Sequence, residues 1–282
     1  MKMQNKSISL LDMVSDYAAS ETLNLPVFPK VAQELLEKMA DENSSIPDIA
    51  AIITKDQALA GQMLKLANSA FFAGLTRVRT IRESIMRLGV NQVYNCLVAS
   101  GQKDFYLSQD PFIGQYLHVL WKHALATARG SQWLLRKTGY PELADEGFLS
   151  GLFHDIGKLL LLRVLETIRA ENQDIEISES FIVEILDSMH VEQGYTLMNE
   201  WSIPEVYCGV VKHHHDEEFD SADPLLMAVR IVDQVCAKTG LSLKPDPALV
   251  TATLAEVHAM SIKEIVLAEL EVVIEDALEA EL

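Results

Sequence analysis

The feature that most constrains the fold is the spacing of apolar residues, which follows a helical period along nearly the whole chain. Apolar side chains recur three and four positions apart, whereas the alternation typical of strands is scarce. The segment after Pro29 has this pattern, and the polar run 41–45 ends it. Ser45 followed by Pro47 predicts the start of another helix, and Gly89 predicts the end of a later one. We therefore expect an all-α fold.

Turns divide the predicted helices into two groups near residue 105. In the second group, helical patterns cover roughly 112–138, 141–168, 178–200, 204–214 and 223–238. One or two helices with an acidic tail follow Pro247. No fixed-period repeat and no low-complexity linker separates the groups. We predict an N-terminal helical bundle, residues 1–105, packed on a second helical lobe, residues 106–282.

The balance of charge bears on the surfaces that the protein can bind. The chain has 23 Lys and Arg against 41 Asp and Glu, a formal net charge of −18. Such a surface repels phosphate backbones and anionic lipid, so we expect no direct binding to nucleic acid or membrane. A small anionic ligand can still bind where local cations outweigh the distant field. Net charge therefore limits what the surface can bind, but it does not exclude an anionic ligand in a pocket.

Cysteine usage and hydropathy indicate the compartment. The three cysteines, Cys96, Cys208 and Cys236, are far apart and form no CxxC pair, which argues against a disulfide framework and a thiolate zinc site. No stretch approaches the length of a membrane span, and the N-terminus has no continuous secretory apolar region. We expect a cytoplasmic protein.

Histidines are concentrated in one part of the chain. Of eight, seven fall between positions 118 and 215, and only His258 lies outside. The pair His154-Asp155 lies in the apolar sequence GLFHDIGK, where a charged aspartate is costly unless something compensates it. A divalent cation accepts carboxylate oxygen and imidazole nitrogen together. A helix N-cap or a buried hydrogen-bonded pair is the alternative explanation.

The other candidate ligands also have ordinary explanations. His123 has apolar neighbours, as a core histidine would, and His190 lies near a predicted helix start. The run 213–215 ends a helix, where cationic residues suit the helix dipole. Asp233 could pair with Arg230 three residues before it. Together these sites require five independent explanations, whereas one metal site explains them all.

The order of these residues resembles a known superfamily. His123, His154-Asp155 and Asp233 resemble the H…HD…D pattern of the HD superfamily of metal-dependent phosphohydrolases. His190 and a pair from the triplet resemble the additional ligands of its two-metal members. His214-His215 is the preferred pair because the preceding helix then matches, and His213-His214 is the alternative register.

The first lobe resembles the HDOD domain (HD-related output domain). The matching segments occur in that family's order: Leu25-Pro-Val-Phe-Pro29, Lys55-Asp-Gln-Ala-Leu59, Leu66-Ala-Asn-Ser-Ala-Phe-Phe72, Ile85-Met-Arg-Leu-Gly89 and Trp201-Ser-Ile-Pro204. The resemblance covers about residues 20–240. It implies a helical bundle packed on an HD-type lobe, and a role in signalling output.

The resemblance also implies roles for individual residues. Asp155 would bridge two cations, and with Lys158 it would be a catalytic residue, Lys158 donating to a phosphoryl oxygen. The metal ligands would be His123, His154, Asp155, His190, His214, His215 and Asp233. This set suits one or two Fe, Mn, Zn or Ni ions. Carboxylates such as Glu192 would orient the ligating histidines.

Two departures from the wider superfamily limit the activity. No Gly-Tyr-Pro follows His215, and the one at 139–141 precedes the HD pair, so hydrolysis of cyclic di-GMP is disfavoured. Val119 stands where three-metal members place a glutamate, so at most two metals are expected.

These points lead to one leading prediction and two alternatives. We predict a signal-transduction module with a metal-bound HD site that binds a phosphorylated small molecule or a protein partner. The alternative is an active metal-dependent phosphohydrolase of phosphomonoesters or nucleotide phosphodiesters, so enzymatic activity stays open. A metal-free structural adaptor is the third. The acidic helix 264–282 has an apolar period that could pack on the core or on a second copy of the chain.

Overall fold

The computed structural model describes residues 9–18, 30–41, 43–55, 57–69, 72, 76–172 and 174–279. All regular elements in these ranges are helices, so the all-α prediction is confirmed. The predicted segment Leu25–Pro29, Gly74 and part of the Asn68–Phe72 string lie outside the described residues. None of the helices in the described ranges combines the length and apolar character needed to cross a membrane.

The first group contains helices α2 to α6. Their bounds are Lys30–Ala40 (α2), Ile46–Thr54 (α3), Gln57–Ala67 (α4), Ile81–Leu88 (α5) and Val90–Lys103 (α6). The local signals predicted several of these ends. Ser45 is the N-cap of α3 with a proline in its first turn, and Thr80 and Glu83 form a capping box on α5. Gly89, at φ 80°, ends α5 in a conformation that side chains disfavour.

Two helices of the N-terminal half were not predicted. Helix α6 begins directly after Gly89, the residue that ends α5, and most of its residues are buried. Helix α1 (Leu10–Ala18) packs on α9 (Ile156–Glu171), about 150 residues later in the chain. The Tyr17 hydroxyl donates a 2.5 Å hydrogen bond to Glu171 there. The proposed boundary near residue 105 stays a prediction.

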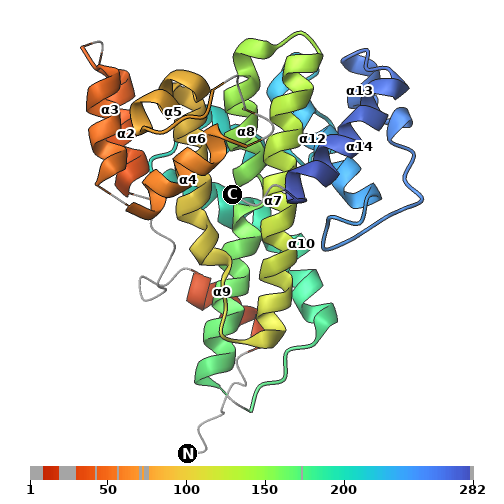
Figure 1. Ribbon diagram of the computed structural model, residues 1–282. Coiled ribbons are helices and arrows are strands. Elements are labelled where there is room, and N and C mark those ends of the chain that lie inside the picture. Colours follow the sequence, from red (N-terminus) through yellow and green to blue (C-terminus); the bar gives the residue numbers. More distant parts are fainter. Residues whose placement is uncertain are drawn as a thin grey trace, which may run out of the picture.

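The second group is built around the long helix α7 (Pro111–Lys137). The helices that follow are α8 (Ala144–Phe153), α9, α10 (Glu179–Glu200), α11 (Glu205–His213), α12 (Pro224–Lys238), α13 (Ala255–Ala259) and α14 (Glu264–Glu279), with 3-10 turns at Asp104–Tyr106, Pro141–Leu143 and Thr251–Thr253. Figure 1 shows α2 to α5 gathered on one side of α7 and α12 to α14 on the other.

Helix α7 separates two hydrophobic cores. One core runs from the first group through α8, α9, α10 and α11. The other joins the C-terminal half of α7 to α12, α13 and α14, so the acidic C-terminal helix packs on its own chain through Leu267, Leu270 and Ile274. Burial of these side chains is the main stabilising contribution. Polar residues that enter the space between the cores therefore have little access to water.

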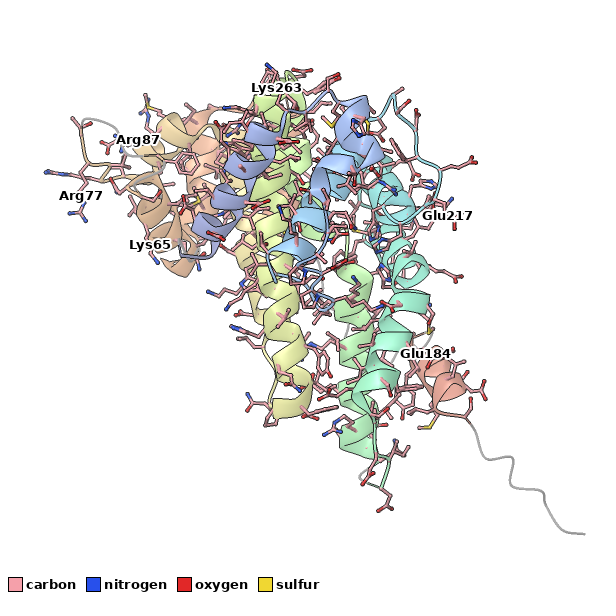
Figure 2. All side chains as sticks on the ribbon, turned by 90° about the vertical axis from the view of Figure 1, so that its right-hand side faces the viewer. Lys65, Arg77, Arg87, Glu184, Glu217 and Lys263 are labelled. Atoms are coloured by element: carbon pink, nitrogen blue, oxygen red, sulfur yellow. The ribbon has the colours of Figure 1, made fainter. Side chains whose placement is uncertain are left out.

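Several basic side chains lie at the outer end of the first helix group. Figure 2 shows Lys65, Arg77 and Arg87 at the outer end of the first group, well separated from Glu184 on α10 and Glu217 after α11. Arg87 also has a structural role, because its guanidinium donates to the carbonyl oxygens of Ala67 and Thr76. The net negative charge of the chain is therefore not a property of the whole surface.

Candidate metal centre

The predicted helix 141–168 is in fact two helices, and the break falls on the His154-Asp155 pair. Helix α8 ends at Phe153, and α9 begins at Ile156. Asp155 stands at the N-cap position of α9, but its side chain makes no capping hydrogen bond. The N-cap explanation for this residue is therefore wrong. Both side chains are instead directed into the protein, where they are at most 3% exposed.

Two glycines allow the neighbouring helices to approach this junction closely. A Cβ on Gly151 of α8 would lie 2.6 Å from the carbonyl oxygen of Thr127 on α7. A Cβ on Gly157 of α9 would lie 1.9 Å from the carbonyl oxygen of His190 on α10. Only glycine leaves room for such contacts. The GLFHDIGK sequence thus fixes the distance from the junction to α7 and α10.

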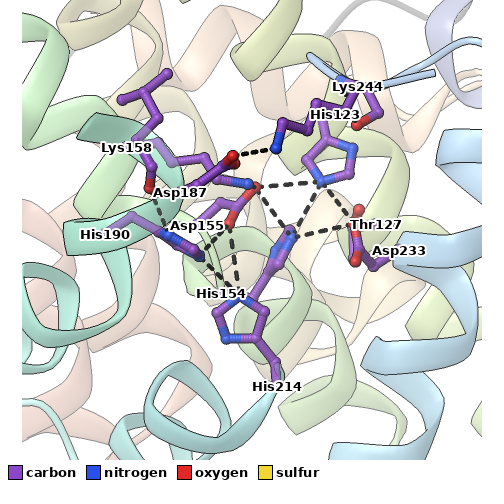
Figure 3. A network of polar contacts seen from close by, with 12 residues as sticks. His123, Thr127, His154, Asp155, Lys158, Asp187, His190, His214, Asp233 and Lys244 are labelled. Carbon is purple, nitrogen blue, oxygen red and sulfur yellow. Dashed lines mark hydrogen bonds and ion pairs between the residues drawn. The ribbon is translucent and has the colours of Figure 1, made fainter. Parts of the chain in front are cut away.

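All seven predicted ligands are brought to this junction from five places in the fold. His123 comes from α7, His190 from α10 and Asp233 from α12, while His214 and His215 follow α11. His154 and Asp155 come from the α8–α9 break. Figure 3 shows the labelled members of the cluster pointing toward one another. Whether they ligate a metal is the subject of the proposal below.

One set of ligand atoms gathers on one oxygen of Asp155. The Nε2 atom of His123 is 3.4 Å from Asp155 Oδ2 and 3.2 Å from Asp233 Oδ1. The Nε2 atom of His154 is 3.5 Å from Asp155 Oδ2 and 3.1 Å from His123 Nε2. His123, His154 and Asp233 are called the first set below.

A second set gathers on the other oxygen of the same carboxylate. The Nε2 atoms of His190 and His214 are each 3.5 Å from Asp155 Oδ1, and they lie 3.4 Å from each other. The ring of His215 is 4.1 Å from that of His214 between centroids. The ligand atoms of all four residues lie within 4.8 Å of one another. Asp155 therefore presents one oxygen to each set.

The imidazole rings are oriented by backbone carbonyl groups. Because a carbonyl oxygen only accepts, each Nδ1 atom must carry the proton, and in the neutral ring Nε2 is left as a lone pair. The four bonds, with Nδ1 to oxygen distances, are His123 to Leu241 (2.7 Å), His154 to Gly151 (2.7 Å), His190 to Leu186 (2.6 Å) and His214 to Val211 (2.8 Å). The sequence predicted that carboxylates such as Glu192 would orient the histidines. In the structure, backbone carbonyl groups orient these four rings instead.

The second set shows most clearly that the residues fit a cation. Lone pairs of His190, His214 and Asp155 Oδ1 face one another, and Asp155 Oδ1 is a buried atom without a hydrogen-bond donor. Buried acceptors directed at each other repel unless a positive charge lies between them. Ligands about 2.0–2.2 Å from a transition metal lie roughly 3.0–3.5 Å apart, which matches the observed separations. The donor set therefore fits a divalent metal.

Burial keeps most of these imidazoles in the form that binds metal. Burial lowers the pKa of His154 to about 3 and that of His190 to about 4. The protein atoms around the ring also lower the pKa of His215 to about 4, although part of this side chain is exposed at the edge of the cluster. These rings are neutral at physiological pH, as ligands must be.

His123 differs from the other histidines. Burial alone would lower its pKa, but hydrogen bonds to Asp155 and Asp233 outweigh burial and hold the pKa well above the ordinary value. Burial would likewise raise the pKa of Asp155, but the positive charge of Lys158, first among several favourable contacts, holds it well below normal. A metal ion bound at His123 Nε2 would take the place of the proton that these carboxylates favour, because a ligating imidazole must be neutral.

Lys158 lies one turn after Asp155, on the exposed side of the cluster. Its ammonium donates a 2.7 Å hydrogen bond to Asp155 Oδ2, and its side chain is 16% exposed. Lys158 is therefore held at the cluster and is not a freely solvated lysine. With Asp233, whose side chain is 14% exposed, and with His215, it borders the part of the cluster that a ligand could reach.

Two further alternatives, an Asp233–Arg230 pair and the His213-His214 register, also fail. Arg230 does not pair with Asp233, because its guanidinium donates instead to Glu256 and to the carbonyl oxygens of His213 and His214. The side chain of His213 points away from the cluster and contacts Asp216 at 2.6 Å. The preferred register, His214-His215, is the one whose rings join the cluster.

Sequence reasoning missed the loop that follows α12. The Leu241 carbonyl orients His123, and the side chains of Lys244 and Asp187 meet beside the cluster (Figure 3). A carbonyl oxygen is present in every residue, so no sequence signal identifies one that orients a ligand. Lys244 has no motif around it.

Comparisons with known proteins identify the family of the chain. A profile of the HDOD domain matches residues 25–217, more than half of the chain. An uncharacterized protein of Treponema pallidum (strain Nichols) is 27% identical over 219 residues, which are 75% of this chain and 42% of that protein. YuxH of Bacillus subtilis (strain 168) is 28% identical over 149 residues, 53% of this chain and 35% of that one. The chain spans less than half the length of these relatives.

Solved structures share the architecture. An HDOD domain protein of Geobacter sulfurreducens superimposes with a TM-score of 0.73 at 21% identity, covering 96% of both chains. A protein of Shewanella amazonensis SB2B, provisionally named a metal-dependent phosphohydrolase, gives 0.73 at 18% identity over 95% of this chain and 96% of its own. A protein of Marinobacter aquaeolei VT8, provisionally named a signal transduction protein, gives 0.65 at 20% identity over 96% and 64%.

The matched fold and the HD-type cluster together define an HD-related helical protein. The chain belongs to the HDOD family. Asp233 lies beyond the residues that the HDOD profile matches, although it completes the first set.

Proposed function

We propose that this HDOD protein is a signal-transduction module whose HD-type lobe holds two divalent cations and binds the phosphoryl group of a small-molecule ligand on them. The observation that carries the proposal is the division of Asp155, which offers one oxygen to each of two sets of histidines. Signalling is supported by membership of the HDOD family and by the name given to the Marinobacter protein.

We assign the residues of the centre to two metal ions. His123, His154 and Asp233 would hold one ion, and His190, His214 and His215 the other, with Asp155 between them. Bound divalent ions would stabilise negative charge on a phosphoryl group and lower the pKa of a water molecule. Lys158 would donate to a phosphoryl oxygen, and the support for this role is that its ammonium lies at the centre, 2.7 Å from Asp155 Oδ2.

Phosphoester hydrolysis is the second candidate. The observation that favours it is the complete ligand set with an exposed edge, formed by His215, Lys158 and Asp233. The name of the Shewanella protein points in the same direction. A signalling module without turnover and a phosphohydrolase share the same metal centre, so the difference between them is kinetic.

Metal content tests the proposal. The full chain is incubated with Mn²⁺, Fe²⁺, Zn²⁺ or Ni²⁺, separated from free metal and assayed by elemental analysis. We expect about two equivalents for wild type, fewer for His154→Ala, and two for His118→Ala, which removes an exposed histidine on the same helix as His123. Wild-type protein that retains none of these metals would overturn the proposal.

Turnover then separates the two candidates. The metal-loaded chain is incubated with a phosphomonoester and with a nucleotide phosphodiester, and phosphate or nucleotide release is measured. The signalling proposal predicts phosphate binding with no release above the metal-loaded buffer. Release that disappears in His154→Ala and persists in His118→Ala would establish the hydrolase instead.

A further inference from the structure

The loop after α12 is tied to the metal centre. The Leu241 carbonyl accepts the hydrogen bond from His123 Nδ1, while the Leu241 amide donates to the Cys236 carbonyl at 2.8 Å. Farther along, the Asp246 amide donates to the Ala237 carbonyl at 2.9 Å. The segment 241–246, which contains Lys244, is therefore anchored to α12 at both ends. Lys244 is carried on a short, fixed loop beside the cluster.

The side chain of Lys244 is held by a carboxylate of another element, α10. Its ammonium forms an ion pair with Asp187, which lies on α10 one turn before His190. Figure 3 shows Lys244 and Asp187 on the same side of the cluster as Lys158. The negative charge of Asp187 also acts on Lys158, although Asp155 acts on it more strongly. The two lysines thus share one charged environment.

The ion pair is easily broken. The side chains of Lys244 and Asp187 are 57% and 45% exposed, and exposed ion pairs contribute little because water solvates both groups. The flexible stem of lysine lets the ammonium move while the loop stays fixed. Lys158, by contrast, keeps one donor on the bridging carboxylate Asp155 and can offer a ligand its remaining donors without leaving it. Lys244 is therefore the ammonium that an incoming anion can draw away from its present partner.

We propose that Lys244 leaves Asp187 and binds a non-bridging oxygen of the ligand's phosphoryl group, so that Asp187 and the ligand compete for one ammonium. The inference rests on the proposed function and adds a residue that selects for phosphate esters. The ligand class is a small molecule with an exposed dianionic phosphoryl group. Lys158 and Lys244 contact that group from the α9 side and from the loop side.

Phosphate binding to the manganese-loaded full chain tests the inference. Inorganic phosphate is titrated by calorimetry into wild type, Lys244→Ala, Lys244→Arg and Lys55→Ala, each with its manganese content measured. Lys55 is the matched control, because it pairs with Glu34 at similar exposure, 63% and 49%, in the first helix group. We expect Lys244→Ala to raise the Kd about tenfold, the effect of losing one charge-assisted hydrogen bond, and Lys55→Ala to leave it unchanged.

Asp187→Asn distinguishes competition from a structural role. A merely structural ion pair requires both partners, so Asp187→Asn and Lys244→Ala would then weaken phosphate binding together. Competition predicts that Asp187→Asn lowers the Kd and that most of this gain is absent in the Lys244→Ala background. Equal Kd values for Lys244→Ala and wild type, with manganese content unchanged, would overturn the inference. If wild-type protein retained no manganese, the proposed function itself would be overturned.

Discussion

Two buried polar clusters lie along α7 and differ in how their atoms are paired. In the amide network, formed by Gln92, Asn95, Gln132 and Asp145, donors meet acceptors. The Gln132 amide donates to Gln92 Oε1 at 3.0 Å and to Asp145 Oδ1 at 3.1 Å, and Asn95 donates to the Asp145 carbonyl. The donors and acceptors of such a network are paired with one another and need no bound ligand.

In the metal centre, acceptors meet acceptors. The Nε2 atoms of His190 and His214 face each other and Asp155 Oδ1, while their Nδ1 protons are used on backbone carbonyls. Both clusters are buried, so burial of polar groups by itself does not indicate a binding site. The informative feature is the direction of the acceptor atoms, because acceptors that face one another fit a bound cation whereas a network of paired donors and acceptors does not.

Replacing the bridging carboxylate should have the largest effect. Asp155→Asn keeps the size of the side chain but removes the charge that both sets share, so we expect loss of both metals. Elemental analysis after incubation with excess Mn²⁺ measures this. In the amide network, Gln132→Leu should leave the metal content unchanged. If Asp155→Asn retained two equivalents, the division of Asp155 between two sets would have no functional meaning.

Metal removal should destabilise the protein more than loss of any one neutral hydrogen bond. A ligand that binds only the folded state at a free concentration one hundred times its Kd stabilises that state by about 2.7 kcal/mol per site. Urea unfolding with and without a chelator measures the difference. Asp155→Asn should show no such difference. A chelator-independent midpoint for metal-loaded wild type would mean that the opposed lone pairs are relieved in another way.

Adding a methyl group at the contact between α9 and α10 should have an intermediate effect. In Gly157→Ala the added methyl would meet the His190 carbonyl at 1.9 Å and the Gly194 amide at 2.7 Å. We expect a loss of about 2 kcal/mol in the free energy of unfolding and weaker binding at the second set. Gly209→Ala on α11 is the control, since its methyl would meet no atom within 4 Å. Its stability should be unchanged or slightly higher.

The amide network should respond least. Gln132→Leu removes donors to Gln92 and Asp145, and we expect it to lower the free energy of unfolding by about 1 kcal/mol. Urea unfolding measures this loss. Metal content is the second measurement, and a decrease would show that the two clusters are coupled through α7, contrary to the contrast drawn between them.

Much of the local structure could be predicted from the sequence. Apolar period, Ser45 and Gly89 predicted helices and their ends, because such signals act within a few residues. The break at His154-Asp155 was missed, since the apolar period continues through it. Helix α6 was missed because it begins directly after the glycine that ends α5, and no capping side chain marks its start.

By itself the sequence determined which residue types form the centre: histidines and aspartates in the order of the HD pattern, within an all-α chain. Only the tertiary structure decided that Asp155 faces two sets, that His213 turns away, and that Leu241 and Lys244 lie beside the site. These facts depend on contacts between residues far apart in the chain. Local periodicity carries no information on such contacts, because they are fixed by how whole helices pack.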